Sequence, residues 1–222
     1  MVYQYQHRNH NPIATLGDFI WKKDKALSKD FCKEMIEKFD ADDRRSPGRV
    51  GTGQVLELVK QTSDLQISNL KDDGWKQQDE VLFNSLKDNL DEYIDYCREI
   101  HPCLYVSPEV FNFNDTGYQI QRYEPEGFYE WHQDWTMEIN PDGTGARVYT
   151  YIWYLNTIKK GDDGYTQFID GSKVRPKAGR MIIFPAVWPY LHRAYPAKVR
   201  KYICTGWIYA KLKEGFDEKL IF

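Results

Sequence analysis

The segment EWHQDW, residues 130–135, contains a histidine and an aspartate two positions apart among bulky side chains. Side chains at positions i and i+2 of a β-strand point to the same face, so His132 and Asp134 can converge on one point if this segment is extended. An imidazole and a carboxylate that share one point in space suit a metal ion. The first prediction is therefore a metal site in this segment.

The sequence offers a third ligand for this site among its five histidines. His7 and His10 lie in a polar segment before a proline, and His101 precedes a proline at the expected end of a helix, so we expect these three to be solvated. His192 lies between two strand-like segments, which places it at a strand edge. Two histidines and one carboxylate form the triad that holds Fe(II) and leaves adjacent positions open, although this residue set is also common by chance.

Lys201 adds a second chemical feature nine positions after His192. If its side chain points into a barrel, its charge needs an anionic partner, because an unpaired buried charge is costly. The distal carboxylate of 2-oxoglutarate, a dicarboxylate that chelates iron, would be a natural partner. Strand alternation puts Lys201 and Arg200 on opposite faces, and the residues alone do not decide which of the two points inward.

Two helical segments precede these residues and would support them. Ser28 is a candidate N-cap for the first helix, in which the apolar residues at helical spacing are Phe31, Met35, Ile36 and Phe39. The second and longer helix lies within residues 76–102, and its apolar stripe consists of Leu82, Leu86, Leu90, Tyr93, Ile94 and Cys97. We expect both helices to pack on a sheet and to have a structural role.

After Pro102 the helical period disappears and short strand-like runs follow. Gly, Pro, Asp and Asn separate these runs, which are residues 118–123, 147–155, 165–170, 180–185 and 201–210. The predicted fold class is α+β, mainly β: a double-stranded β-helix, or jelly roll, with supporting N-terminal helices. We expect one domain over residues 1–222, with a helix-rich support layer in 1–104 and the jelly-roll core in 105–222.

The composition argues against several classes of partner. A formal net charge of -3 and a pI near 6.0 provide no overall basic surface, so we expect no nucleic-acid binding. No stretch approaches the roughly 18 apolar residues of a membrane span, and the four cysteines form no CxxC pair. We therefore expect a cytoplasmic protein with reduced cysteines and no membrane partner, and the sequence leaves the oligomeric state open.

The stretch ADDRRSPGRVGTG, residues 41–53, combines charge, proline and glycine, which is typical of an exposed mobile loop. Its glycines lack the GK[ST] ending of a phosphate-binding loop, so we do not expect a nucleotide site there. A loop of this kind could close over a substrate.

Five stretches of the second half resemble the iron(II)/2-oxoglutarate oxygenases, and specifically their prolyl 4-hydroxylase-like branch. They are RYEPEGFYEWHQD, RVYTYIWYLN, DGYTQF, PKAGRMIIFP and LHRAYPAKVRKYICTGW, which occur in the family order with near-family spacing over roughly residues 118–208. The N-terminal half matches only loosely. The resemblance implies a jelly-roll enzyme that uses Fe(II), 2-oxoglutarate and dioxygen to hydroxylate a C–H bond, with release of succinate and carbon dioxide, and it allows ascorbate as an accessory reductant.

The resemblance also implies roles for individual residues. It makes His132, Asp134 and His192 the catalytic iron ligands and Lys201 the anchor for the distal carboxylate of 2-oxoglutarate. Tyr123 is similar to the family tyrosine that hydrogen-bonds this co-substrate. Halogenating relatives replace the carboxylate ligand, so the presence of Asp134 favours hydroxylation.

Further matches concern the co-substrate pocket and the substrate. Tyr154 and Thr205 fall at positions that reach or line the pocket for the distal carboxylate in relatives. Tyr129 and Arg147 fall where relatives contact the substrate, and Trp188 could line the entrance. Each has a structural alternative, because Arg147 could be a solvated strand charge and the other four could be packing residues.

The sequence determines the substrate less well than the reaction. A peptidyl proline is the first prediction, because relatives of this shape take prolines in extended peptides, and a peptide or protein partner follows from it. The alternatives are a free amino acid or another small metabolite, and, from a different class, a non-catalytic metal-binding jelly roll. The family often has Gly-Gly-Glu-Thr where this chain has DGYT, so Tyr165 replaces an acidic residue and substrate preference does not transfer directly.

Overall fold

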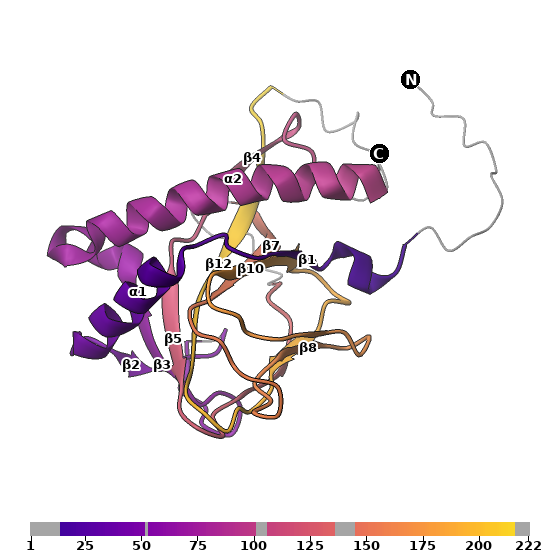
Figure 1. The fold of residues 1–222 in the computed structure, drawn as a ribbon. Helices are drawn as coiled ribbons and strands as arrows, with labels where there is room; N and C mark the ends of the chain where they lie inside the picture. Colours follow the sequence, from indigo (N-terminus) through magenta and orange to yellow (C-terminus); the bar gives the residue numbers. More distant parts are fainter. Residues whose placement is uncertain (1–13, 52, 101–105, 136–144, 216–222) are drawn as a thin grey trace.

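The computed structural model of the chain describes residues 14–51, 53–100, 106–135 and 145–215 (Figure 1). Its strands form two antiparallel sheets with a cavity between them. The larger sheet has the strand order β1 (Trp21–Lys23), β10 (Arg180–Pro185), β7 (Ala146–Tyr154), β12 (Lys201–Leu212), β5 (Gln119–Tyr123), β3 (Ser63–Gln66) and β2 (Ser46–Pro47), and β4 (Phe111–Asp115) also pairs with β12. The smaller sheet has the order β6 (Tyr129–His132), β11 (His192–Ala194), β8 (Thr166–Phe168) and β9 (Lys173–Val174).

The helices cover the outer side of the larger sheet (Figure 1). The two long ones are α1 (Lys29–Ala41) and α2 (Lys76–Ile100), and the short helical turns are η1 (Leu16–Phe19), η2 (Ile67–Leu70) and η3 (Lys71–Trp75). The side chain of Ser28 caps α1 by accepting the backbone N–H of Phe31 at 3.1 Å, as the sequence predicts. All six residues of the predicted apolar stripe in α2 are buried. Both helices therefore bury one face against the sheet.

Alternation along β7 separates the two faces of the larger sheet. The ring of Tyr149 packs edge to face on Tyr93 of α2, with centroids 5.1 Å apart, and the indole N–H of Trp153 donates to the Ser85 hydroxyl at 3.2 Å. Thr150, which lies between these two aromatic residues in the strand, lines the cavity between the sheets. Aromatic packing beneath α2 thus fixes which side chains of β7 face inward.

The predicted mainly β fold with supporting helices is confirmed, and the predicted run 180–185 coincides with β10. The strands β2 and β3 were not predicted, because their sequences are short and polar. Strand β4 was not predicted either, although Phe111 and Phe113 alternate with asparagines in it. Cys32, Cys97 and Cys204 are free and buried, whereas Pro102 and Cys103 lie outside the described residues. Within the part of the chain that the structure describes, no helix combines the length and apolarity needed to cross a membrane.

Gly206 tests the close packing at the centre of β12. A Cβ atom at this position would lie 2.2 Å from the Tyr151 hydroxyl oxygen and 2.5 Å from the carbonyl oxygen of Gly117. We expect Gly206→Ala to lower the free energy of unfolding by about 1–3 kcal/mol, because an added methyl overpacks a buried site. Gly51→Ala is the matched control, because nothing lies within 4 Å of a Cβ there. Urea denaturation measures both, and equal losses in the two variants would contradict the prediction.

Candidate active site

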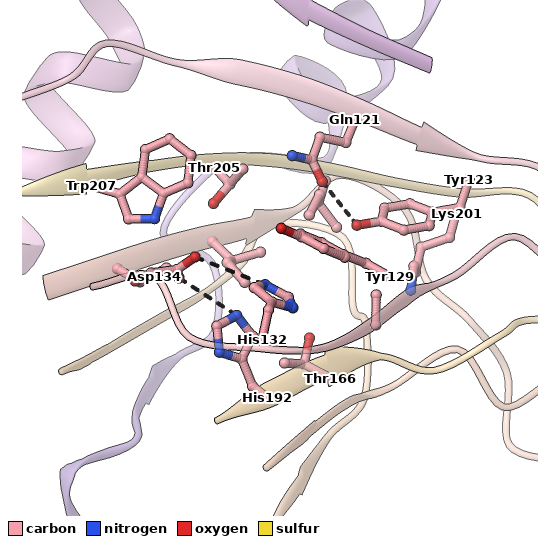
Figure 2. Close-up of a pocket in the computed structure, with 14 residues that line it drawn as sticks. Gln121, Tyr123, Tyr129, His132, Asp134, Thr166, His192, Lys201, Thr205 and Trp207 are labelled. Atoms are coloured by element: carbon pink, nitrogen blue, oxygen red, sulfur yellow. Dashed lines mark hydrogen bonds and ion pairs between the residues drawn. The ribbon is translucent and has the colours of Figure 1, made fainter. Parts of the chain in front are cut away.

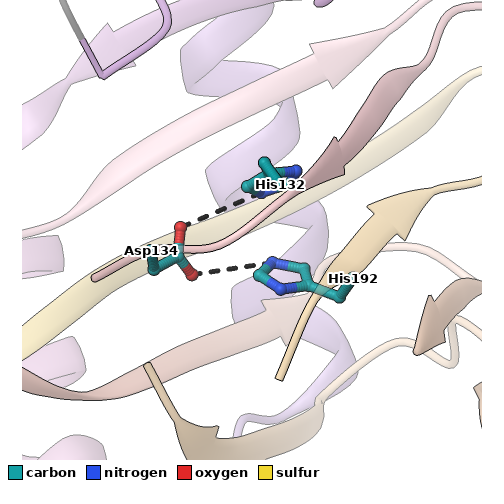
Figure 3. Close-up of side chains that lie close together, drawn as sticks. All are labelled: His132, Asp134 and His192. Atoms are coloured by element: carbon teal, nitrogen blue, oxygen red, sulfur yellow. Dashed lines mark ion pairs between the residues drawn. The ribbon is translucent and has the colours of Figure 1, made fainter. Parts of the chain in front are cut away.

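The three predicted metal ligands converge at one end of the smaller sheet (Figure 3). His132 is the last residue of β6 and pairs directly with His192, the first residue of β11. The Asp134 carboxylate faces both imidazoles, with its Oδ1 3.8 Å from His132 Nε2 and its Oδ2 3.5 Å from His192 Nε2. One donor atom from each of the three residues lies within 4.8 Å of the others. This set is the only such cluster of potential ligands within the described ranges.

His132 and Asp134 converge for a reason that differs in part from the predicted strand alternation. The strand ends at His132, so Asp134 is placed by the segment that follows and not by continued alternation. The Thr150 hydroxyl of β7 holds the carboxylate by donating to its Oδ2 at 2.6 Å. The larger sheet therefore fixes Asp134 through Thr150. The spacing of His132 and Asp134 in the sequence does not predict this contact.

Backbone carbonyl groups orient both imidazoles. His132 Nδ1 lies 2.7 Å from the Glu130 carbonyl oxygen, and His192 Nδ1 lies 3.2 Å from that of Tyr190. An Nδ1–H that donates to a carbonyl leaves the Nε2 lone pair available, and both Nε2 atoms face Asp134. This arrangement leaves both histidines with the tautomer that a metal requires.

The electrostatics of the cluster also suit a divalent cation. Burial, and secondarily the nearby His192, lower the pKa of His132 to about 3, so this imidazole is neutral at pH 7. Burial alone would raise the pKa of Asp134, but the two imidazoles and the Thr150 hydroxyl lower it, so the carboxylate is ionised. A neutral imidazole and an ionised carboxylate are donors that suit Fe(II), and the three described side chains fit that metal.

Lys201 lies in the same cavity with its charge almost completely removed from water. It pairs with Tyr123 across β12 and β5, is 2% exposed, and has its Nζ 4.2 Å from the centroid of the Tyr123 ring. The Nζ donates to the carbonyl oxygens of Gly164 at 3.3 Å and Tyr195 at 3.4 Å, and no described carboxylate forms an ion pair with it. Burial lowers the pKa of Lys201 to about 7. Arg200 points the other way and pairs with a glutamate at the surface, so Lys201 is the inward residue.

The cavity contains most of the residues that the sequence assigns to it (Figure 2). The predicted residues that line it are Tyr123, Tyr129, His132, Asp134, His192, Lys201 and Thr205. Those that were not predicted are Gln121, Thr150, Ile152, Thr166, Ala194, Ile203 and Trp207. The available signal was alternation, because Gln121 lies two positions from Tyr123 and Trp207 two positions from Thr205.

Hydrogen bonds fix the side chains around Lys201. The Tyr123 hydroxyl donates to Gln121 Oε1 at 2.8 Å, and the Thr205 hydroxyl donates to a backbone carbonyl at 2.8 Å. Tyr154 does not itself line the cavity, but its hydroxyl lies 2.7 Å from that of Thr166, which does. An anion beside Lys201 would therefore meet a pre-ordered polar shell.

The predicted substrate residues occupy three different environments. The Tyr129 ring stacks on the His132 ring, with centroids 3.6 Å apart and an interplanar angle of 13°. Arg147 donates to the Asp134 carbonyl oxygen at 3.3 Å, and its guanidinium lies 4.1 Å from the Trp207 ring. Trp188 is 72% exposed and does not line the cavity.

Comparison with known proteins defines the class. The family model of the 2OG-Fe(II) oxygenase superfamily matches residues 118–209, the part of the chain that provides all three ligands and Lys201. Residues 118–209 are therefore similar to that superfamily, and with the ligand cluster they identify the chain as a 2-oxoglutarate-dependent dioxygenase whose co-substrates are 2-oxoglutarate and dioxygen and whose metal is Fe(II). No curated protein matches the chain closely enough to serve as a relative.

Solved structures place the fold with the prolyl hydroxylases. A viral collagen prolyl hydroxylase from Paramecium bursaria Chlorella virus-1, in complex with 2-oxoglutarate, is 21% identical and has a TM-score of 0.59, and the match covers 88% of this chain and 98% of that one. A Pseudomonas putida prolyl-4-hydroxylase is 20% identical with a TM-score of 0.59, over 86% and 92% of the two chains. A Trichoplax adhaerens prolyl hydroxylase in complex with a hypoxia inducible factor peptide is 16% identical with a TM-score of 0.62, over 86% and 84%. The predicted jelly-roll fold is confirmed by this likeness.

Two substitutions test the metal cluster. We expect His132→Ala to abolish Fe(II) binding, because two ligands are left. Thr150→Val should weaken Fe(II) binding by only about tenfold, because it removes the hydroxyl that holds Asp134 and leaves the ligands in place. Anaerobic calorimetric titration measures both affinities. Wild-type affinity in His132→Ala would reject the assignment.

Lys201→Met tests the burial of the ammonium group. Protonation favours the unfolded chain, because the pKa of Lys201 falls from 10.5 to about 7 on folding. Without 2-oxoglutarate we expect the variant to gain up to about 4 kcal/mol in the free energy of unfolding at pH 7 and below, and to lose that advantage as the pH rises toward 10.5. Urea denaturation at pH 7 and pH 9.5 is the measurement. A gain that did not depend on pH would point to apolar packing instead of a desolvated charge.

Proposed function

We propose that this dioxygenase hydroxylates a peptidyl proline, in the manner of a prolyl 4-hydroxylase, with release of succinate and carbon dioxide. The observation that supports this most directly is the cavity that joins the metal-ligand cluster to the buried Lys201 and lies beside an open groove. The likeness to three prolyl hydroxylases points to the same substrate.

Different residues of the cavity would bind the metal and the co-substrate. His132, Asp134 and His192 would hold Fe(II), and Lys201 would bind the distal carboxylate of 2-oxoglutarate beside Tyr123. When bound, Fe(II) together with 2-oxoglutarate supplies the activation of dioxygen that hydroxylation of a C–H bond requires. The chain orients both groups and limits access of water, because Lys201, His192 and Asp134 are all buried.

Two aromatic rings could confine a substrate ring next to the ligands. Tyr129 stacks on His132, and Trp207 lines the cavity near Asp134 (Figure 2). A saturated five-membered ring presents apolar C–H groups, and aromatic faces provide a suitable surface for them.

A groove beside the cavity favours a residue within a polypeptide over a free metabolite. Lys60 lines this groove and forms a β-bridge with Tyr129, which lines the cavity, so the two spaces adjoin. Strand β2 with Gly48, and Pro125 with Gly127, also line this groove. A chain that enters from this groove would have room for residues that flank the reacting one.

Turnover with defined substrates tests the proposal. We expect Fe(II) and 2-oxoglutarate to form a visible charge-transfer band under anaerobic conditions, and expect proline-containing peptides to gain the mass of one oxygen atom with one succinate formed per hydroxylation. His132→Ala is the control and should show neither the band nor product. Hydroxylation of free proline or another small metabolite, with all peptides unchanged, would replace the peptide substrate by the small-molecule alternative. Metal binding without the band would reject the oxygenase reaction for this chain.

A further inference from the structure

A buried ion pair lies outside the metal cluster, beside the groove described above. Lys60 and Asp64 are 3% and 5% exposed, and Lys60 Nζ lies 2.7 Å from Asp64 Oδ2. Replacing such a pair with apolar residues is often neutral or stabilising, because the desolvation of two charges offsets their attraction. Asp64 Oδ1 is also buried and has no hydrogen-bond partner among the described residues. Stability is therefore a weak explanation for this pair.

The Lys60 ammonium lies against the ring of Tyr129. Its Nζ is 5.2 Å from the ring centroid, within the range of a cation–π contact. The same ring stacks on the imidazole of His132, with centroids 3.6 Å apart. The Tyr129 ring thus connects Lys60 to the predicted metal ligand His132 by direct contacts.

The backbone provides a second connection between the same residues. Segment 59–61 adds to the free edge of β6, since Glu130 N–H donates to the Val59 carbonyl and Gln61 N–H donates to the Phe128 carbonyl, both at 2.8 Å. The carbonyl of Glu130 is also the group that orients His132 through its Nδ1 at 2.7 Å. The segment that contains Lys60 therefore holds the strand that orients the ligand.

Segment 46–49, which includes β2 and partly lines the groove, packs directly on the ion pair. A Cβ atom at Gly48 would lie 2.9 Å from Lys60 Cε and 3.1 Å from Asp64 Oδ2. The Lys60 Nζ also donates to the Arg49 carbonyl at 3.4 Å. The same cation therefore contacts both segment 46–49 and the Tyr129 ring.

We propose that Lys60 is a positioning residue that holds the Tyr129 ring against His132 and so couples segment 46–49 to the metal site. This inference rests on the proposed Fe(II) site and adds a residue that acts on a metal ligand through another residue without touching the metal. Asp64 has the subordinate role of fixing the ammonium group. Without the Lys60 ammonium the Tyr129 ring is held less firmly, and the His132 imidazole loses the packing of that ring against it.

The test measures the affinity and d–d absorption spectrum of Co(II), a probe of the cluster that needs no turnover. Lys60→Met/Asp64→Leu removes both charges, which avoids an unpaired buried carboxylate and preserves the fold. We expect about tenfold weaker Co(II) binding and an altered spectrum, the size of effect that outer-shell partners of a ligand usually have. Lys60→Arg keeps a cation beside the ring and should bind Co(II) like wild type.

Lys71→Met is the matched control. Lys71 also pairs with a buried aspartate, Asp79, at 2.9 Å, but this pair lies in the helical layer, away from the metal cluster. The control variant should leave Co(II) binding unchanged. If Lys60→Met/Asp64→Leu folds and binds Co(II) like wild type, the pair is a stability element only and the inference is overturned.

Tyr129→Leu keeps the test decisive if the double variant does not fold. It leaves the ion pair intact and removes the ring, and we expect the same tenfold loss of Co(II) affinity. Wild-type affinity in Tyr129→Leu would overturn the inference. If the wild-type protein binds neither Co(II) nor Fe(II), the proposed function itself is wrong. This result is distinguishable from a failure of the Lys60 inference, in which the wild type binds metal and the variants bind it equally well.

Discussion

The register between β6 and β11 is the constraint on which the rest of the site depends. These strands have four and three residues, yet their pairing sets His132 directly opposite His192. A shift of one residue would turn one imidazole to the other face of the sheet and destroy the cluster. So few ladder hydrogen bonds cannot fix a register alone, and neighbouring elements must do so. Segment 59–61 holds β6 from its free edge, and β8 holds β11 from the other side.

The larger sheet supplies what the smaller sheet lacks. It carries Thr150, which secures Asp134, and Lys201, which lies opposite Tyr123. Its strands are longer and its outer face is anchored under α2 by Tyr149 and Trp153, so its inward positions are well determined. The site is therefore built from a short sheet that presents two imidazoles and a rigid sheet that orients the carboxylate and presents the cation.

Lys60 and Lys201 are both buried, which is unfavourable for a charged group, and the two lysines differ in how their charge is compensated. Lys201 has no described carboxylate partner, and its burial opposes folding unless an anion enters the cavity. Lys60 has its carboxylate partner in Asp64 and lies instead against the ring that packs on His132. A ligand is the missing partner in the first case, whereas the chain itself provides the partner in the second. Such local departures from optimal stability are expected where a protein binds or positions reactive groups.

The sequence by itself determined the helices, the main strands and the metal ligands. Helical and strand periods are local properties. The residue set of His132, Asp134 and His192 is common by chance, and the resemblance to the oxygenase family singled it out. Only the tertiary structure decided that Lys201 points inward and Arg200 outward, that Trp188 faces solvent, and that Thr150 holds Asp134. The Lys60 contact with Tyr129 was equally invisible, because it joins segments distant in the chain. Local spacing fixes the face on which a side chain lies, whereas contact across sheets depends on the register and packing of strands that meet only in the folded protein.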